Sequence, residues 1–252
     1  MAGVDDFEVR YVEVVGNVVS APQVIRTVQR RVGIALVFDG TGQPMVSYLG
    51  GAPGFAPGTS IFWFQSDAVI ARRTPPATWT ESVLAADGDV ASCGNPVSDR
   101  GFLVGLFPAM AFDGVGRLHL AYRDVHDGQF PLQDLAASDV EVVEDVIGNR
   151  VTRCAQPGGI DKQGHGGHLR MAIGPGNEPM IVHDQIFSMV TGPGHDVRFQ
   201  RRTSTGAWTQ PAVVATVSDT MTGASLAYHP TTGAAFAVTD GATSRLQYWS
   251  NS

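Results

Sequence analysis

The sequence has few charged residues and no long apolar run, and each shortage excludes a class of protein. Charged residues make up 16% of the 252 residues, beside 30 glycines and 15 prolines, which is typical of many short strands joined by turns and not of long solvated helices. The net charge of −7 argues against nucleic acid as a partner, because phosphate binding needs a basic face. No apolar run approaches the ~18 residues of a membrane span.

The sequence contains four copies of one pattern of apolar residues. Each copy reads as an apolar strand, a glycine-containing turn and a second apolar strand, and the copies cover residues 36–48, 110–122, 171–183 and 226–239. Asp39-Gly40 and Asp113-Gly114 predict tight primed turns, in which backbone φ is positive. A third strand is expected at 60–68, 133–140, 195–202 and 244–252, and a fourth at 78–86, 140–148 and 207–216.

The repeats predict an all-β protein with one domain over residues 1–252, a four-bladed β-propeller. The blades are expected at about 33–90, 105–150, 168–217 and 224–252, and the N-terminal segment 8–16 completes the last blade. We expect the strand near Val9–Val15 to pair with the strand around Leu246–Trp249 and to close the ring. A β-sandwich of hairpins is the alternative.

The segments "ALVFDGTGQPMVSY", "AMAFDGVGRLHLAYRD" and "GAWT" resemble a bacterial, sialidase-like propeller repeat whose blades open with a pattern such as S-x-A-x-D-x-x-G-x-P-H-I-S-Y. The resemblance spans nearly the whole chain, although the third and fourth copies are degenerate. It implies a fold and no particular activity. A looser similarity to propeller polysaccharide lyases rests on the D-x-H segment in "AYRDVHDGQF".

Strand direction in such a propeller places the long loops on one rim, together with most histidines. His168 precedes the inner strand of the third blade, and His183 and Asp184 end the strand beside it, so we expect both histidines, His165 and Asp184 to form a metal site. Imidazoles with a carboxylate suit Zn²⁺, Fe²⁺, Mn²⁺ or Cu²⁺. Ordinary surface histidines, with His183 bonded to the backbone, are the alternative.

A second candidate site follows the second strand of the second blade. Asp124 and His126 form a possible catalytic pair, in which a histidine flanked by carboxylates acts as a general base; a solvated turn is the alternative. Tyr122, Asp99 and Arg100 are candidate ligand-binding residues, since the arginine can bind a carboxylate or sulfate through two parallel hydrogen bonds. The Asp99-Arg100 pair can equally be a structural lock for its loop.

Two cysteines occupy matching contexts, "ASCGNP" at Cys93 and "TRCAQP" at Cys154, just after predicted fourth strands. This match predicts a disulfide between neighbouring blades, with two free thiols as the alternative. The segment "MAGVDDFEVRYVEVV" has no basic stretch followed by an apolar one, so no signal peptide is visible. We expect a secreted or periplasmic protein whose signal peptide is absent from this chain.

These patterns predict a propeller that binds a metal or a small-molecule or saccharide ligand on its long-loop face. An enzyme of the lyase or hydrolase class, which uses a metal or His126 on the same face, is one alternative. A structural interaction module without metal is another. The oligomeric state and the identity of the ligand stay open.

Overall fold

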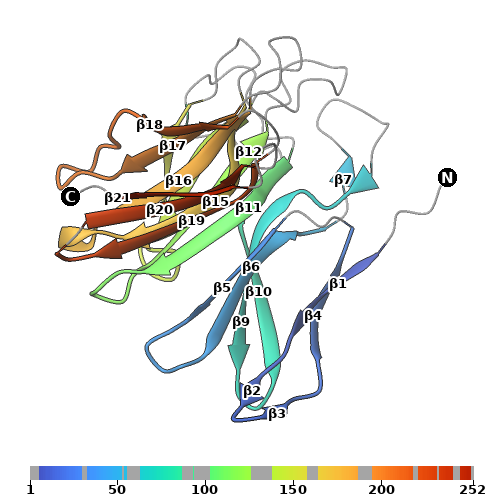
Figure 1. The fold of residues 1–252 in the computed structure, drawn as a ribbon. Helices are drawn as coiled ribbons and strands as arrows, with labels where there is room; N and C mark the ends of the chain where they lie inside the picture. The colour runs from blue at the N-terminus through green and yellow to red at the C-terminus, as the bar shows by residue number, and fades with distance from the viewer. Residues whose placement is uncertain are drawn as a thin grey trace.

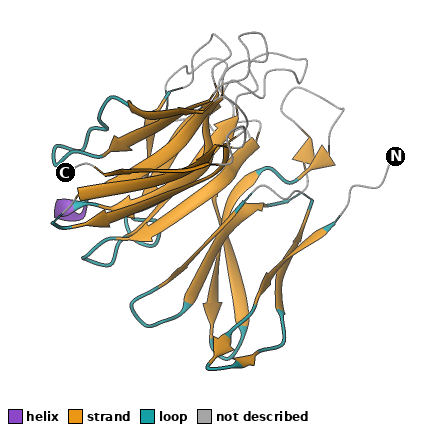
Figure 2. Cartoon of the chain, in the orientation of Figure 1, coloured by secondary structure: helices purple, strands orange, loops and turns teal. Residues whose placement is uncertain are grey.

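The protein consists of β-strands and turns (Figures 1 and 2). This computed structural model describes residues 6–29, 33–52, 54–55, 63–86, 93, 103–125, 138–157, 164–186, 195–217, 221–231, 233–240 and 245–250. One short 3₁₀ turn, η2 at Pro175–Asn177, is the helical element within these ranges, and no described helix has the length and apolar character of a membrane span. The predicted all-β class is confirmed.

Four antiparallel units follow one another along the chain, and in each the strands lie side by side in chain order. Unit 1 contains β5 (Ile34–Phe38), β6 (Pro44–Gly50), β9 (Asp67–Thr74) and β10 (Thr78–Ala85). Unit 2 contains β11 (Leu103–Phe112), β12 (Leu118–Val125), β13 (Ser138–Glu144) and β14 (Val151–Gln156). Unit 3 contains β15 (Gly164–Ile173), β16 (Pro179–Ile186), β17 (His195–Arg201) and β18 (Ala212–Val217). Unit 4 contains β19 (Met221–His229), β20 (Gly233–Asp240) and β21 (Arg245–Ser250).

The N-terminal segment forms its own hairpin, of β1 (Phe7–Tyr11) and β4 (Gln23–Val28). Two further short pairs are present, β2 (Val14–Val15) with β3 (Val18–Val19) and β7 (Gly54–Phe55) with β8 (Trp63–Phe64). Val9 and Val28 of the β1–β4 hairpin pack on Val46, Tyr48 and other side chains of unit 1. The hairpin therefore covers one face of unit 1.

The units pack face to face, because strand residues alternate between the two faces of a sheet and both faces of the middle units are apolar. The core between units 1 and 2 includes Met45 and Leu120, and the core between units 2 and 3 includes Val142 and Ile181. Between units 3 and 4, Val182 packs with Phe236. Each unit thus presents a leading face to the preceding unit and a trailing face to the following one.

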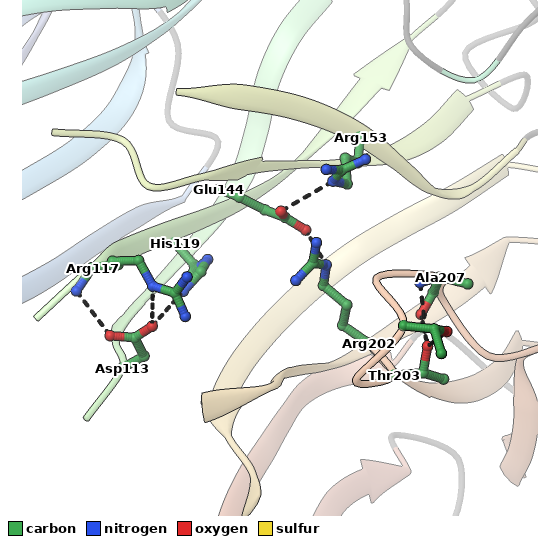
Figure 3. A network of polar contacts seen from close by, with 9 residues as sticks. Asp113, Arg117, His119, Glu144, Arg153, Arg202, Thr203 and Ala207 are labelled. Atoms are coloured by element: carbon green, nitrogen blue, oxygen red, sulfur yellow. Dashed lines mark hydrogen bonds and ion pairs between the residues drawn. The ribbon is translucent and has the colours of Figure 1, made fainter. Parts of the chain in front are cut away.

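Charged side chains join units 2 and 3 at the end of the sheets that carries the short turns (Figure 3). Glu144 of β13 contacts Arg153 of β14 through an Nε–Oε2 pair 3.0 Å apart, and it also pairs with Arg202, which follows β17 of unit 3. Beside this group, Asp113 accepts a hydrogen bond of 2.7 Å from Nε of Arg117. Of these contacts, the Glu144–Arg202 pair spans the two units.

The tight hairpins form where they are expected, but their turns are of another type. Gly42 and Gly116 have φ values of 80° and 84°, whereas Gly40 and Gly114 are outside the positive-φ region. The amide of Gly42 donates to the carbonyl of Asp39, and Asp39 donates to the carbonyl of Gln43. A type I turn with a left-handed glycine at its end therefore replaces the expected primed Asp-Gly turn.

The predicted ring closure is not confirmed. Within the described ranges β1 pairs with β4, while β21 pairs with β20, so the strand near Val9–Val15 does not join the strand around Leu246–Trp249. The expected strand 8–16 ends early because its continuation turns back at Gly16, whose φ is 60°, and pairs with itself as the β2–β3 hairpin. The assignment of the whole chain to one domain stays a prediction.

Two strand assignments in the sequence are also wrong. Segment 140–148 belongs mostly to the third strand of unit 2, because Asp145 turns the chain with a φ of 52° and accepts the amide of Gly148 at its carbonyl. The fourth strand is Val151–Gln156, and in unit 1 the third strand is Asp67–Thr74 and not 60–68. In both units a Ser-Asp pair marks the start of the true third strand, at Ser66-Asp67 and Ser138-Asp139.

Candidate functional site

One end of the units has a polar interior. We call it the loop face, the end at which the second strand of each unit finishes and the third begins. Among the described residues, nine buried polar side chains lie there: Gln65, Ser66, Asp67, Arg123, Asp124, Ser138, Asp139, Asp184 and Gln185. Buried polar groups must be hydrogen-bonded or charge-compensated, so burying many of them at one end lowers the stability of the fold. Such a cost is expected where the groups hold the loops in place or bind a ligand.

Arg123, in β12 of unit 2, is a buried cation of the loop face. Its Nε donates a hydrogen bond of 2.8 Å to Oγ of Ser138 on the neighbouring strand. Burial lowers the pKa of Arg123 to about 10, and the carboxylate of Asp184 in unit 3 opposes this shift. The guanidinium is still charged near pH 7 and links units 2 and 3 electrostatically.

Asp184 and His168 form a dyad on two adjacent strands of unit 3. Oδ2 of Asp184 lies 3.2 Å from Nδ1 of His168. A Cβ atom on Gly167 would lie 1.9 Å from Oδ1 of Asp184, so the carboxylate occupies the space that a side chain at this position would fill. Gly167 is therefore required for the dyad to form.

His168 has an uncommon backbone conformation, with φ at 47°. Counting back from the turn of each unit, Gly33 of unit 1 and Phe107 of unit 2 occupy the same position, with φ of 88° and 50°. The positive φ follows from irregular pairing at the start of β11 and β15, where the ladder skips residues. Non-glycine residues held in this region cluster at functional sites, where the surrounding structure compensates for the strain.

The accessible part of the dyad is the imidazole. The side chain of His168 is 35% exposed while that of Asp184 is 2% exposed, and the ring of Phe107 lies 5.4 Å from the imidazole between centroids. A buried carboxylate on one ring nitrogen orients the imidazole and favours a proton on that nitrogen. The geometry can support hydrogen bonding to a ligand, proton transfer, or ligation of a metal by a carboxylate-oriented histidine.

His183 is close in sequence to this dyad but has a different role. Its Nδ1 lies 3.1 Å from the carbonyl oxygen of Asp184, and its Nε2 lies 3.2 Å from Oε1 of Gln200. Tyr48 and Tyr122 occupy the same position in units 1 and 2, and their hydroxyls donate to Glu81 and Glu141. Burial lowers the pKa of His183, which keeps the ring neutral inside the sheet stack.

The remaining predicted site residues divide into described and undescribed ones. Tyr122 is fully buried against unit 1, and Asp124 is buried at the end of β12. The backbone of His165 lies in β15 opposite Gln185. His126, Asp99 and Arg100 lie outside the described residues.

The predicted metal quartet is brought together in part. His168 and Asp184 contact each other, whereas the ring of His183 is engaged with Gln200. Among the described residues, no group of three or more His, Cys, Asp or Glu side chains converges in a way that would hold a metal ion. The four-residue site stays a prediction.

The predicted disulfide is confirmed. Cys93, between units 1 and 2, is bonded to Cys154 of β14, with Cα atoms 4.5 Å apart. The bond thus holds the connection between two units against the outer strand of the second unit.

Sequence reasoning missed Arg123, Phe107 and a repeated aspartate as members of the loop face. Asp67, Asp139 and Asp196 stand at equivalent points of three third strands, opposite Gly50, Asp124 and Gln185. The signal was available, because each aspartate follows Ser or His and is followed directly by an apolar residue. For Phe107, the only signal is its alignment with His168.

Comparisons with known proteins support the fold and leave the activity open. No protein-family model matches the sequence, and a search of curated proteins gives no significant match. A protein of unknown function from Dyadobacter fermentans has 10% identity and a TM-score of 0.52, over 88% of this chain and 61% of that one. A fucose lectin from Kordia zhangzhouensis has 9% identity and a TM-score of 0.42, over 73% of this chain and 99% of that one. An N-acetylgalactosamine deacetylase from F. plautii has 13% identity and a TM-score of 0.45, over 82% and 62%.

The first of these similarities concerns the fold alone, because the identity is low and the chain spans 61% of the Dyadobacter protein. The other two TM-scores are too low to carry an argument. The function must therefore be inferred from the chemistry of the loop face.

Proposed function

We propose that the loop face of units 2 and 3 binds a hydroxyl-rich small ligand of the saccharide class, and that the four units act as propeller blades that present it. The observation that carries the proposal is the accessible imidazole of His168, oriented by buried Asp184 and packed beside the ring of Phe107. A sugar offers hydroxyl groups to such an imidazole and C–H groups to an aromatic ring.

The charge balance of the loop face also suits a polar ligand. Asp124, Asp139 and Asp184 are buried near one end of the sheets, and Arg123 is a buried cation between units 2 and 3. These buried groups are held in place by the sheets, so they can support a polar ligand at the loop face with little reorganisation.

The test uses methyl glycosides of a neutral hexose, a 6-deoxyhexose, an N-acetylhexosamine and a hexuronate as probes, with binding measured by saturation-transfer NMR and titration calorimetry. For any probe that binds, His168→Ala is expected to weaken binding about 10-fold, which corresponds to about 1.4 kcal/mol and the loss of one good hydrogen bond. His229→Ala is the matched control, because His229 is an exposed histidine at the end of β19. Equal affinity of His168→Ala and the wild-type protein would contradict the proposal.

Proton-transfer catalysis is the second candidate, and the dyad itself favours it. An imidazole whose Nδ1 faces a carboxylate can act as a general base through its other nitrogen, as a lyase or hydrolase requires. On this proposal, turnover of a uronate-containing polysaccharide is abolished in both His168→Ala and Asp184→Asn. Turnover that persists in His168→Ala would exclude His168 as the base.

A divalent transition metal (Zn²⁺, Fe²⁺, Mn²⁺ or Cu²⁺) remains part of the proposal as a possible ligand of His168. Asp184 would then orient the imidazole, as carboxylates commonly do for metal-bound histidines. Metal ligation requires a neutral imidazole, so Zn²⁺ titrated into wild-type protein should bind more weakly in acidic buffer than in neutral buffer. Equal Zn²⁺ binding by His168→Ala would show that the ion binds elsewhere.

The disulfide supports a location outside the cytoplasm. Bonds such as Cys93–Cys154 form and persist mainly in oxidising compartments. We therefore include secretion or export to the periplasm in the proposal, and intact mass under non-reducing conditions from the native source tests it.

A further inference from the structure

The short hairpin of β2 and β3 has no buried residue in either strand. Its four strand residues, Val14, Val15, Val18 and Val19, are 65%, 76%, 72% and 64% exposed. We call these four side chains the valine tip. Single exposed apolar residues are ordinary on a protein surface, whereas a contiguous group of them marks a site that contacts another apolar surface.

Both faces of this hairpin are apolar. Val14 pairs with Val19, and Val15 pairs with Val18. Cross-strand partners share a face and successive residues lie on opposite faces, so one valine pair lies on each face. The neighbouring strand β1 alternates in the usual way, with apolar residues facing unit 1 and charged residues facing solvent. A flat surface that covered one face of the β2–β3 hairpin would leave two valines in water.

The base of the hairpin is bonded to itself and to unit 1. The amide of Ser20 donates to the carbonyl of Glu13, and the amide of Glu13 donates to Oγ of Ser20, both over 2.9 Å. Glu13 also forms an ion pair with Arg73 of β9, whose guanidinium lies 5.5 Å from the ring centre of Tyr11. Gly16, with φ at 60°, turns the chain at the far end. The valine tip is therefore presented on an anchored base.

The valine tip and its surroundings carry little charge. Residues 14–25 contain no Asp, Glu, Lys, Arg or His, and the adjacent Glu13 is compensated by Arg73. The turn between β9 and β10 is exposed and uncharged at residues 75–77, and the carbonyl of Pro76 accepts a hydrogen bond of 3.4 Å from the same arginine. Figure 1 shows β2 and β3 at this end of unit 1. Because β9 starts at the loop face and ends here, the valine tip lies at the opposite end from the loop face.

We propose that the valine tip inserts into the interface of a lipid bilayer, at the boundary between headgroups and acyl chains. A lipid medium surrounds an inserted hairpin on all sides, so it covers both valine pairs at once. The insertion is shallow, because Asn17 and the open backbone groups of the turn still need water or headgroups as hydrogen-bond partners. The loop face then points away from the bilayer and stays accessible.

A second copy of the chain is the less favourable occupant. Stable protein interfaces contain about 20–30 residues on each side, and the valine tip offers four. Binding to a bilayer has no such minimum size, because it strengthens with each apolar group that leaves water. The absence of a charged patch around the tip makes this binding independent of anionic lipids.

The test reduces the apolar surface of the tip and keeps its shape. All four valines are replaced by threonine, which is also β-branched and favours strands, so the hairpin is retained. Val15→Asp, a single change at the most exposed of the four, is a second variant. The matched control replaces four exposed valines elsewhere by threonine, namely Val83, Val115, Val151 and Val213. Thermal unfolding confirms that each variant is folded.

Binding is measured by co-sedimentation with vesicles of phosphatidylcholine, a zwitterionic lipid, at low and high salt. We expect the wild type and the control to bind alike and both tip variants to bind at least about 10-fold more weakly. Salt should have little effect, because no charge takes part. Wild-type protein that stays unbound at millimolar lipid, or tip variants that bind as well as the wild type, would overturn the proposal. A wild-type dimer that forms without lipid and is lost in the tip variants would also overturn it, because a second copy then covers the valines.

Discussion

His183 shows how one buried side chain can take part in the fold and stand next to a functional residue. Its imidazole occupies the position of Tyr48 and Tyr122 and bonds toward Gln200, while the following residue, Asp184, turns toward His168. Neighbouring strand residues point to opposite faces, so consecutive residues of the "HD" pair act in different places. The sequence pair alone does not reveal this division.

The neutral state of His183 makes stability depend on pH. Burial lowers its pKa in the folded state, so below about 6.5 the unfolded chain binds a proton that the folded chain does not. This contribution to stability is present above pH 6.5 and is lost as the pH falls below that value, at about 1 kcal/mol per pH unit. Urea midpoints measured from pH 7.5 to pH 5.5 should fall less in His183→Gln than in the wild-type protein.

His229→Gln is the control for this measurement, because His229 is exposed. It should reproduce the wild-type slope. A His183→Gln variant with an unchanged slope would show that His183 already carries its proton in the folded state or titrates outside this window.

At the level of elements, the hairpins of units 1 and 2 depend on an aspartate at the first position of the turn and a glycine at the last. Oδ1 of Asp39 accepts hydrogen bonds of 2.9 Å from the amides of Thr41 and Gln43. The hydrogen bond from the Thr41 hydroxyl, with those from Gln43 and Arg72, holds the pKa of Asp39 well below its ordinary value. The ionised side chain therefore fixes the turn, and Gly42 supplies the left-handed residue that completes it.

We predict that Gly42→Ala is more destabilising than Gly40→Ala. Gly42 has a φ of 80°, so alanine there is strained by about 1–2 kcal/mol, although no neighbouring atom obstructs the added Cβ. Gly40 is also unobstructed and its φ is ordinary, so alanine there should change the free energy of unfolding by less than about 0.5 kcal/mol. Equilibrium unfolding in urea measures both values. The reverse order would indicate the primed Asp-Gly turn.

At the scale of the whole molecule, the disulfide is the covalent link between the connection after unit 1 and the outer strand of unit 2. Cys93 and Cys154 are separated by 61 residues, and cross-links over loops of this length contribute about 2–4 kcal/mol, mainly by restricting the unfolded chain. We expect a Cys93→Ala/Cys154→Ala variant to unfold at a lower urea concentration than the oxidised wild type.

Reductant provides the internal control for this prediction. It should lower the urea midpoint of the wild-type protein toward that of the double variant and leave the double variant unchanged. A wild-type midpoint that does not respond to full reduction would show that packing of β14 alone holds the two units together.

The all-β class, the four repeats and the disulfide could be predicted from the amino-acid sequence alone. Apolar alternation, turn glycines and matched cysteine contexts are local or repeated signals. They can be read without knowing which residues are in contact in the folded protein. The strand boundaries near Asp145 were predicted wrongly. A non-glycine residue has positive φ there, which local propensity does not predict.

Which polar residues meet and which apolar side chains stay exposed depends on the packing of the units against one another. His168, Asp184 and Phe107 come from different strands, and their contact depends on irregular pairing at the start of β11 and β15. Ring closure was predicted from strand counts, but the partner of β1 is set by side-chain packing on unit 1 and by the turn at Gly16. Phe38 and Phe112 have the same sequence context, but Phe38 is exposed and Phe112 is half-buried. The difference arises because a preceding unit packs on Phe112, and this depends on how the sheets assemble and not on the repeat sequence.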